Sequence, residues 1–344
     1  MNNQAEYERP LISVVIPVRN EEKFIGQTLQ YLIQQDYPRE KVEIIVVDGR
    51  SDDSTRQVIE DIAARDARIR LLDNPKRISS AARNIGVKAA TGDIITFIDG
   101  HVYIDRDQLL RNTAILMNER KVSVLSRPQF LDTPDNGFFQ KAVALARKSA
   151  FGHGLDSTIY LEEEKLVDPT SSGASYKREV FERAGYFDES FDAAEDVEFN
   201  FRVSRAGFRS FSSPKLAVYY YPRKNLRSLF KQMTRYGVGR FRFLRKHHQG
   251  VSSGALLLAL FYIGLILLVL LSILSNRLLP VAGIFLALYV AANLVSSLIA
   301  ALKRGIKYLP VLPLIYLTIH FGLAWGFINE ALSQIRGPRR KILR

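Results

Sequence analysis

The sequence contains no cysteine, and no long charge-free apolar run precedes about residue 250. Without thiols the chain can form neither disulfide bridges nor thiolate metal sites, and a cysteine nucleophile is excluded. The first residues lack a basic region followed by an apolar stretch, so we expect no secretory signal and a soluble part that stays in the cytoplasm. No recognised nucleic-acid-binding motif is present, and we expect no nucleic-acid partner.

Positive charge is concentrated beside apolar segments. The net charge is +13, and much of it lies in residues 223–246 and 336–344. This placement favours lipid head groups over DNA. Residues 254–274 and 278–302 are each long enough to cross a bilayer, since about 20 residues suffice.

A third apolar run, residues 309–328, is interrupted by Pro310, Pro313 and His320, which predicts a kinked or re-entrant segment. Two or three passes are therefore open. A third full crossing would place the basic residues 336–344 outside, against the positive-inside rule.

The first hundred residues alternate between strand and helix patterns. Apolar runs predict buried strands, and apolar residues at helical spacing predict amphipathic helices. The expected strands are residues 11–17, 42–49 and 93–99, and the expected helices are residues 22–35, 51–66 and 78–92. This order predicts a doubly wound, largely parallel α/β sheet. Residues 131–164 give no clear pattern.

Two acidic motifs are candidates for the chemistry. Asp99 and His101 follow the third expected strand, and ligands bind at the carboxyl edge of parallel strands. A carboxylate and an imidazole could hold a divalent cation there, although Asp-Gly also makes an ordinary solvated turn. Glu195 and Asp196 begin a helical pattern, where acids also simply complement the helix dipole.

Four pieces, "PVRNE", "VVDGRSDD", "IDGH" and "EDVEF", occur in an order and spacing that resemble family 2 glycosyltransferases of the GT-A fold. The likeness covers about residues 11–250 and is greatest to membrane-anchored exopolysaccharide β-glucosyltransferases of the succinoglycan type. It implies a Rossmann-like, mostly parallel open sheet and an inverting, metal-dependent transfer from a nucleotide sugar, most often UDP-linked. The implied cofactor is Mg²⁺ or Mn²⁺.

The resemblance also assigns donor-side residues. Metal ligands would be Asp99 and His101, where family members commonly have Asp-x-Asp. Asp48 would accept from the uracil N3–H, although Gly49 stands where relatives often have a second Asp. The residues implied to contact the donor are Pro17, Glu21, Asp48, Arg83 and Asp99. Glu21 would reach the ribose, but its charge near a helix start has an equally good structural explanation.

On the acceptor side, the Glu-Asp motif implies Asp196 as general base and Glu195 as its orienting neighbour. Gln232, Arg235 and Tyr236 resemble a Gln-x-x-Arg-Trp acceptor signature with Tyr in place of Trp. A membrane-surface helix explains the same residues, with apolar side chains such as Leu229 and Met233 on one side and cations on the other.

We therefore expect a GT-A domain in residues 1–220, an interfacial amphipathic segment in 221–250 and an α-helical transmembrane anchor in 251–344. The expected activity is sugar transfer from a UDP-sugar to a polyprenyl-diphosphate-linked saccharide, at the cytoplasmic face of the inner (plasma) membrane. Two alternatives stay open: a processive polysaccharide synthase, and a catalytically silent membrane scaffold that has kept the fold.

Overall fold

A computed structural model describes residues 9–153, 159–160, 162–248 and 253–335, and its contacts divide the chain into two compact units. The first unit comprises Met1–Thr133 and Thr158–Tyr221, and the second comprises Pro134–Ser157 and Pro222–Arg344. Residues 134–157 thus join the second unit, although the sequence-based boundaries run the first range on to 220. The functional division of the chain stays a prediction.

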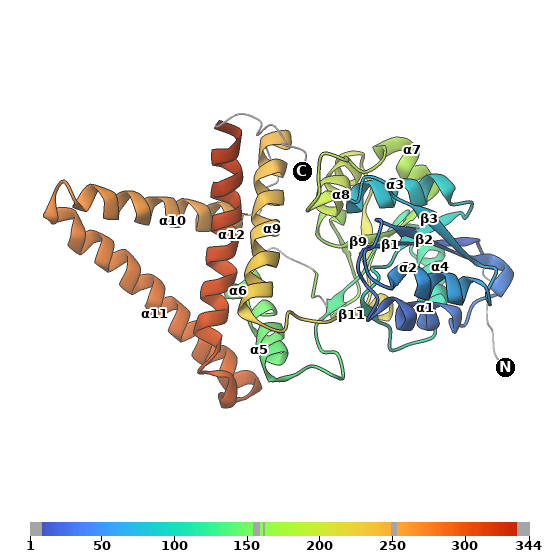
Figure 1. Ribbon diagram of the computed structural model, residues 1–344, viewed down its shortest axis with the longest axis horizontal. Coiled ribbons are helices and arrows are strands. Elements are labelled where there is room, and N and C mark those ends of the chain that lie inside the picture. Colours follow the sequence, from blue (N-terminus) through green and yellow to red (C-terminus); the bar gives the residue numbers. More distant parts are fainter. Residues whose placement is uncertain (1–8, 154–158, 161, 249–252, 336–344) are drawn as a thin grey trace. The chain divides into compact units, whose positions relative to one another are not determined.

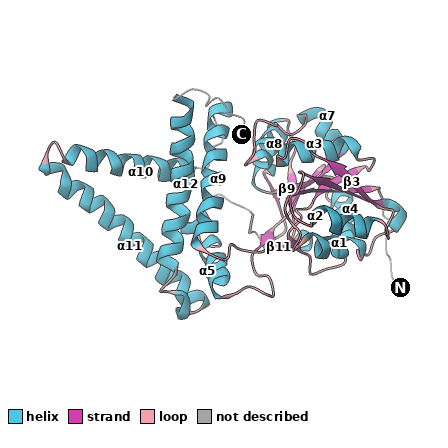
Figure 2. Ribbon diagram, in the orientation of Figure 1, coloured by secondary structure: helices cyan, strands magenta, loops and turns pink. Residues whose placement is uncertain are grey.

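The first unit is built on a mixed eight-stranded sheet, accompanied by a small three-stranded sheet of order β5-β11-β7 (Figure 2). The large sheet has the order β3-β2-β1-β4-β9-β6-β10-β8, and β1 to β4 are parallel to one another. The strands are β1 (Ile12–Val18), β2 (Val42–Asp48), β3 (Ile69–Asp73), β4 (Ile94–Phe97), β5 (Val102–Tyr103), β6 (Val124–Ser126), β7 (Gln129–Phe130), β8 (Lys165–Val167), β9 (Gly173–Lys177), β10 (Ser210–Ser212) and β11 (Val218–Tyr220).

Helices cover both faces of the large sheet because alternate strand residues point to opposite sides. In β1, Ile12, Val14 and Ile16 join a core with α1, α2 and α4, whereas Val15 joins a second core with α3, α7 and α8. These helices are α1 (Ile25–Ile33), α2 (Thr55–Ala63), α3 (Ser79–Ala89), α4 (Leu109–Glu119), α7 (Arg178–Ala184) and α8 (Glu195–Arg205). The predicted α/β class is confirmed, with antiparallel additions from β8 and β9.

One strand escaped the sequence analysis. We expected the second and third helices to follow one another directly, but β3 (Ile69–Asp73) lies between them and pairs with β2. The strand stands at the edge of the sheet, and Arg70 interrupts its apolar residues and is exposed. A strand at the edge of a sheet has a neighbouring strand on one side only and is more exposed to solvent. Its residues therefore need not form a continuous apolar run.

The second unit is entirely helical in the residues described. It contains α5 (Phe138–Arg147), α6 (Ala150–His153), α9 (Leu226–His247), α10 (Ser253–Ser272), α11 (Leu279–Arg304) and α12 (Leu312–Ile335). By length and composition alone, α11 and α12 could cross a membrane, and α10 has a shorter apolar stretch, Leu256–Ser272. Figure 1 shows α10 and α11 as a hairpin that projects away from the pair formed by α9 and α12.

The expected kink in the third apolar run is wrong. Helix α12 is continuous, because Pro310 precedes it and Pro313 occupies its first turn, where a proline removes no helical hydrogen bond. His320 lies inside this helix but is buried, and its Nε2 lies 2.7 Å from the carbonyl oxygen of Phe151, to which it donates. The polar residue is therefore satisfied within the second unit.

Helices α9 and α12 pack side by side in the same direction. Phe230 stacks on Phe321, and twelve residues further along α9 the Nε of Arg242 lies 2.8 Å from Oε1 of Glu330. Glycine allows this close approach: a Cβ added at Gly326 would lie 2.0 Å from the carbonyl oxygen of Thr234. The backbones are therefore in direct contact, as at other glycine-mediated helix crossings.

The predicted amphipathic helix is present as α9, but its apolar side does not face outward. Leu229 and Met233 are buried, with exposed fractions of 0% and 3%, in a cluster with residues of α5 and α12 such as Val143 and Ile315. The apolar side that we expected to meet lipid is thus covered by protein.

Candidate active site

The Asp-Gly-His triplet lies at the carboxyl end of β4, as predicted. Strands β1, β2 and β4 are parallel, so their carboxyl ends share this edge of the sheet. Gly100 packs against β1, where an added Cβ would lie 2.7 Å from Cγ1 of Val18. A larger residue would push the triplet away from the strand, so glycine keeps Asp99 and His101 at the edge.

Asp99 is held as an anion by three neighbours. The hydroxyl of Tyr220 donates to Oδ2 at 2.8 Å, and Nη2 of Arg83 lies 3.4 Å from Oδ1. Burial opposes ionisation, but Arg83, His101 and the Tyr220 hydroxyl outweigh it and keep the pKa of Asp99 below its ordinary value. The site therefore presents a negative carboxylate at neutral pH.

His101 is oriented by Glu21, which precedes α1. The Nδ1 of His101 lies 2.8 Å from Oε1 of Glu21, and the imidazole makes edge contacts with the rings of Tyr220 and Phe24. If Nδ1–H donates to the carboxylate, a neutral ring would carry its lone pair on Nε2. A carboxylate behind an imidazole is the usual support for a metal-ligating histidine.

The chemistry of this donor set fits a divalent cation. A carboxylate oxygen from Asp99 and an imidazole nitrogen from His101 suit Mn²⁺, and the carboxylate also suits Mg²⁺. Within the described part of the chain, no group of three or more His, Cys, Asp or Glu side chains could hold a metal. Two protein ligands would leave the other coordination positions to water and phosphate oxygens.

Arg83 connects this edge to the start of α8. Its guanidinium contacts Asp99 through Nη2, its Nε lies 3.4 Å from Oε1 of Glu195, and it lies over the ring of Phe97. Its side chain is only 12% exposed, and the attraction of the two carboxylates raises its pKa in spite of burial. The donor contact expected for Arg83 stays a prediction.

Glu195 and Asp196 form the first turn of α8, as predicted. Ala194 before them has a φ of 60°, a left-handed conformation that costs a non-glycine residue about 1–2 kcal/mol. Such strain is retained only where the surroundings require it, and here it directs the chain into the acidic turn.

Asp196 has the electrostatics of a base. Its side chain is exposed, yet nearby protein atoms displace part of its hydration. This desolvation, together with the charge of Glu195, raises the pKa of Asp196 above its ordinary value, and Arg83 opposes the shift only in part.

Asp48 ends β2 and is almost fully buried. Its Oδ1 accepts from the Ser51 hydroxyl at 2.6 Å, and Oδ2 lies 3.5 Å from Nη1 of Arg56. In the pairing of β1 with β2, Pro17 lies opposite Val47, the residue before Asp48. The Asp48 carboxylate therefore holds the turn after β2. Its expected contact with the uracil stays a prediction, and so does the expected contact of Pro17 with the donor.

Arg127 was missed by the sequence analysis. It is buried behind β4, where its Nη2 donates to Oγ1 of Thr96 at 2.7 Å and its Nη1 donates to the carbonyl oxygen of Phe97. Burial lowers its pKa to about 10. All its partners are about 30 residues away or more, so no local pattern distinguishes it from a surface arginine.

The residues expected to hold the acceptor lie on α9, in the second unit. Nε2 of Gln232 donates to the Tyr236 hydroxyl at 3.3 Å, and Tyr236 lies 5.9 Å from the guanidinium of Arg147. Arg235, between them, is exposed. Their expected role stays a prediction.

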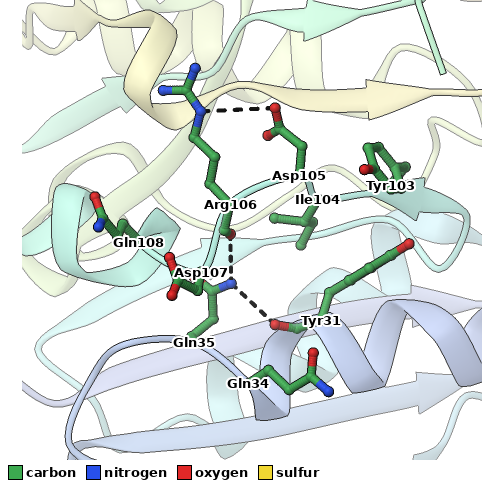
Figure 3. Close-up of a pocket in the computed structure, with 9 residues that line it drawn as sticks. All are labelled: Tyr31, Gln34, Gln35, Tyr103, Ile104, Asp105, Arg106, Asp107 and Gln108. Carbon is green, nitrogen blue, oxygen red and sulfur yellow. Dashed lines mark hydrogen bonds and ion pairs between the residues drawn. The ribbon is translucent and has the colours of Figure 1, made fainter. Parts of the chain in front are cut away.

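A pocket of about 530 Å³ in the first unit is separate from these residues (Figure 3). Its wall combines Tyr31 of α1, and Gln34 and Gln35 just after that helix, with residues 103–108. Gln35 Nε2 donates to the carbonyl oxygens of Tyr31 and Arg106 and ties the two walls together. None of the predicted site residues lines it.

Comparison with known proteins agrees with this fold. The chain is 27% identical over 329 residues to the dolichyl N-acetyl-alpha-D-glucosaminyl phosphate 3-beta-D-2,3-diacetamido-2,3-dideoxy-beta-D-glucuronosyltransferase of Methanococcus voltae, covering 94% of this chain and 97% of the relative. It is 34% identical over 236 residues to the succinoglycan biosynthesis protein ExoA of Rhizobium meliloti, covering 68% and 70%.

Among solved structures, the mannosyltransferase PcManGT from Pyrobaculum calidifontis, in complex with GDP-Man and Mn²⁺, has the same fold. Its TM-score is 0.61 at 22% identity, and the match covers 95% of this chain and 88% of that one. Residues 13–185 match the family described as Glycosyl transferase family 2. This segment includes the ends of β1, β2 and β4 with Asp48, Asp99 and His101, and the chain belongs to glycosyl transferase family 2.

Proposed function

We propose that this glycosyltransferase moves one sugar, with inversion, from a UDP-sugar to a polyprenyl-diphosphate-linked saccharide at the cytoplasmic face of the inner membrane. The names of two relatives, one acting on a dolichyl-linked substrate and one in succinoglycan biosynthesis, support an acceptor of this class. The apolar helices α10 and α11 support attachment to the membrane in which such an acceptor resides.

The single observation that carries the proposal is the position of Arg83 between two acidic groups. It contacts Asp99 at the strand edge and Glu195 at the start of α8, each at 3.4 Å. One guanidinium therefore joins the residues assigned to the donor with those assigned to the acceptor. A group transfer needs both substrates within reach of each other, which this arrangement supports.

Each residue then has a chemical task. Asp99 and His101 would hold the cation, which when bound would neutralise the charge of the donor diphosphate. Asp196 would take the proton of the acceptor hydroxyl while that oxygen bonds to the anomeric carbon from the side opposite the leaving UDP. Its raised pKa makes it a better proton acceptor than an ordinary aspartate. Glu195, tied to Arg83, would keep this turn in place.

The test uses the full chain in detergent with radiolabelled UDP-, GDP- and TDP-sugars and a lipid extract. We expect transfer of label into lipid from a UDP-sugar, and loss of that transfer in EDTA with recovery on adding Mn²⁺ or Mg²⁺. Full activity in EDTA would remove the metal from the proposal. Transfer from a GDP- or TDP-sugar alone would overturn the donor assignment.

Two further results would select the alternatives. A long product chain in place of a single added sugar would favour a processive synthase, consistent with the Gln232, Arg235 and Tyr236 signature. Calorimetry that detects no UDP binding in the presence of Mn²⁺ would favour a silent scaffold.

A further inference from the structure

Helices α9 and α12 must take the same orientation in a membrane because they are packed together. Their contacts advance in step, from Phe230 with Phe321 to Arg242 with Glu330. Between these points Gly237 faces the α12 backbone, where an added Cβ would lie 2.1 Å from the carbonyl oxygen of Leu323. A membrane orientation proposed for α12 therefore applies to α9 as well.

Helix α9 is unsuited to hydrocarbon. Exposed cations occur from its first turn to its last, and each is costly at the centre of a bilayer. These cations are Arg227, Lys231, Arg235, Arg245 and Lys246. If α12 crossed the membrane, α9 would carry them across beside it. Length and composition alone allow α12 to cross, but its packing against α9 argues against this.

Helix α12 instead presents an apolar face, which the exposed Asn329 interrupts in its last third. Its exposed large apolar residues are spaced by three, four or seven positions, which places them on one side of a helix. They are Leu314, Leu317, Phe321, Trp325, Leu332 and Ile335. Ile315, Tyr316 and Ile319, on the other side, are buried in the helical cluster with α5 and α9. An apolar face of this kind, with cations on the helix beside it, is typical of attachment to an anionic bilayer surface.

The α10–α11 hairpin has the opposite character. Helix α10 contains no charged residue, and large apolar side chains such as Leu267 and Leu288 are exposed around both helices. In Figure 1, α10 leaves α12 crosswise, and α11 slants back from the tip of the hairpin to the start of α12. Tyr262 of α10 contacts Phe321 on the apolar face of α12, and Tyr289 of α11 contacts the buried His320.

We propose that α12 lies in the plane of the cytoplasmic membrane surface together with α9, with its apolar face in the bilayer, and that only the α10–α11 hairpin crosses. The inference rests on the proposed membrane attachment and specifies which helices provide it. Because the hairpin crosses the membrane twice, the segments before α10 and after α11 lie on the same side. The basic residues 336–344 then lie on the cytoplasmic side, which removes the conflict with the positive-inside rule.

The only tryptophan of the sequence makes the test direct. Trp325 is near the middle of α12 and is half exposed on its apolar face. The full-length chain is reconstituted in vesicles of phosphatidylcholine and phosphatidylglycerol that contain lipids brominated either near the glycerol or near the chain end. We expect the shallow bromines to quench Trp325 more strongly. Stronger quenching by the deep bromines would place the middle of α12 at the bilayer centre and overturn the proposal.

Labelling of single cysteines gives an independent readout, because the natural chain has none. Lys307→Cys and Ser333→Cys place thiols at exposed positions near the two ends of α12, and Ser275→Cys places one at the tip of the hairpin. A membrane-impermeant maleimide should label the first two from the same side and the third from the opposite side. Labelling of Lys307→Cys and Ser333→Cys from opposite sides would mean that α12 crosses.

These outcomes separate the two proposals. A chain that fails to remain with vesicles on flotation would overturn the membrane attachment and the in-plane arrangement together. A chain that floats with the vesicles but shows deep quenching would overturn only the arrangement. The sugar-transfer assay tests the activity independently of both results.

Discussion

The Nδ1 of His101 lies 2.8 Å from Oε1 of Glu21, although the two residues are 80 positions apart. The histidine follows β4 and the glutamate precedes α1, so the fold of the parallel sheet brings them together. We expected Glu21 to reach the ribose of the donor. Its contact with the imidazole fixes the ring instead, and we predict that this contact sets the tautomer that metal binding by His101 would require.

Replacing Glu21 should therefore weaken metal binding. Glu21→Ala is expected to lower Mn²⁺ affinity by about tenfold or more, the usual effect of removing the partner of a ligating histidine. Glu21→Gln, whose amide oxygen can still accept from Nδ1–H, should retain more of it. Titration calorimetry with Mn²⁺ in the presence of UDP measures both, with exposed Glu40→Ala as control. An unchanged affinity in Glu21→Ala would separate Glu21 from the metal.

Replacing the proposed base should abolish turnover but preserve donor binding. Asp196→Asn keeps the shape of the side chain and removes its ability to take a proton, so kcat should fall by about a hundred- to ten-thousand-fold. The Kd for UDP should not change, because the residue is assigned to the acceptor side. Asp192→Asn, an exposed acid four residues earlier, is the matched control. Full turnover in Asp196→Asn would exclude it as the base.

The pH dependence of kcat/KM should reflect the raised pKa of Asp196. A base acts only when ionised, and desolvation and Glu195 raise this pKa above the ordinary 3.8. On acidification, kcat/KM should therefore fall at a higher pH than it would for an ordinary aspartate. In Glu195→Gln, which removes one of the causes of the raised pKa, the remaining activity should persist to lower pH. Measuring UDP release across a range of pH gives the profiles of the wild-type chain and of Glu195→Gln. If the activity of the wild-type chain fell only at or below the ordinary pKa of aspartate, the assignment of Asp196 as the base would be contradicted.

The sequence predicts best what depends on local pattern. The apolar runs of β1 and β2 and the helical spacing of α8 gave the right elements because each buries residues at a regular interval. The motifs around Asp99 and Glu195 were recognised because members of a family share the same motifs in the same order along the chain. Their approach to Arg83 depends on the packing of α3 between them, which no local pattern encodes.

What the sequence could not give depends on distant partners. Tyr220 donates to Asp99 from 121 residues away, and in the sequence it is one of three consecutive tyrosines. Helix α5 gave no clear signal because part of its burial comes from α12, about 170 residues later. For the same reason the apolar side of α9 was read as facing lipid, when it faces another helix of the chain.

The contact between α9 and α12 can be broken at a single glycine. In Gly326→Ala the new Cβ would meet the carbonyl oxygen of Thr234 at 2.0 Å, so the backbones must separate and Arg242 would move from Glu330. We expect a loss of about 2 kcal/mol or more, as for other overpacked sites, and a lower Tm in detergent.

Gly283→Ala is the matched control, because nothing lies within 4 Å of its added Cβ in α11. Alanine favours a helix over glycine by about 1 kcal/mol, so its Tm should stay the same or rise slightly. Thermal unfolding of both variants in the same detergent compares them directly. If Gly326→Ala unfolded at the same temperature as Gly283→Ala, the two backbones would not be in contact. The requirement that α12 share the orientation of the cationic α9 would then have no basis.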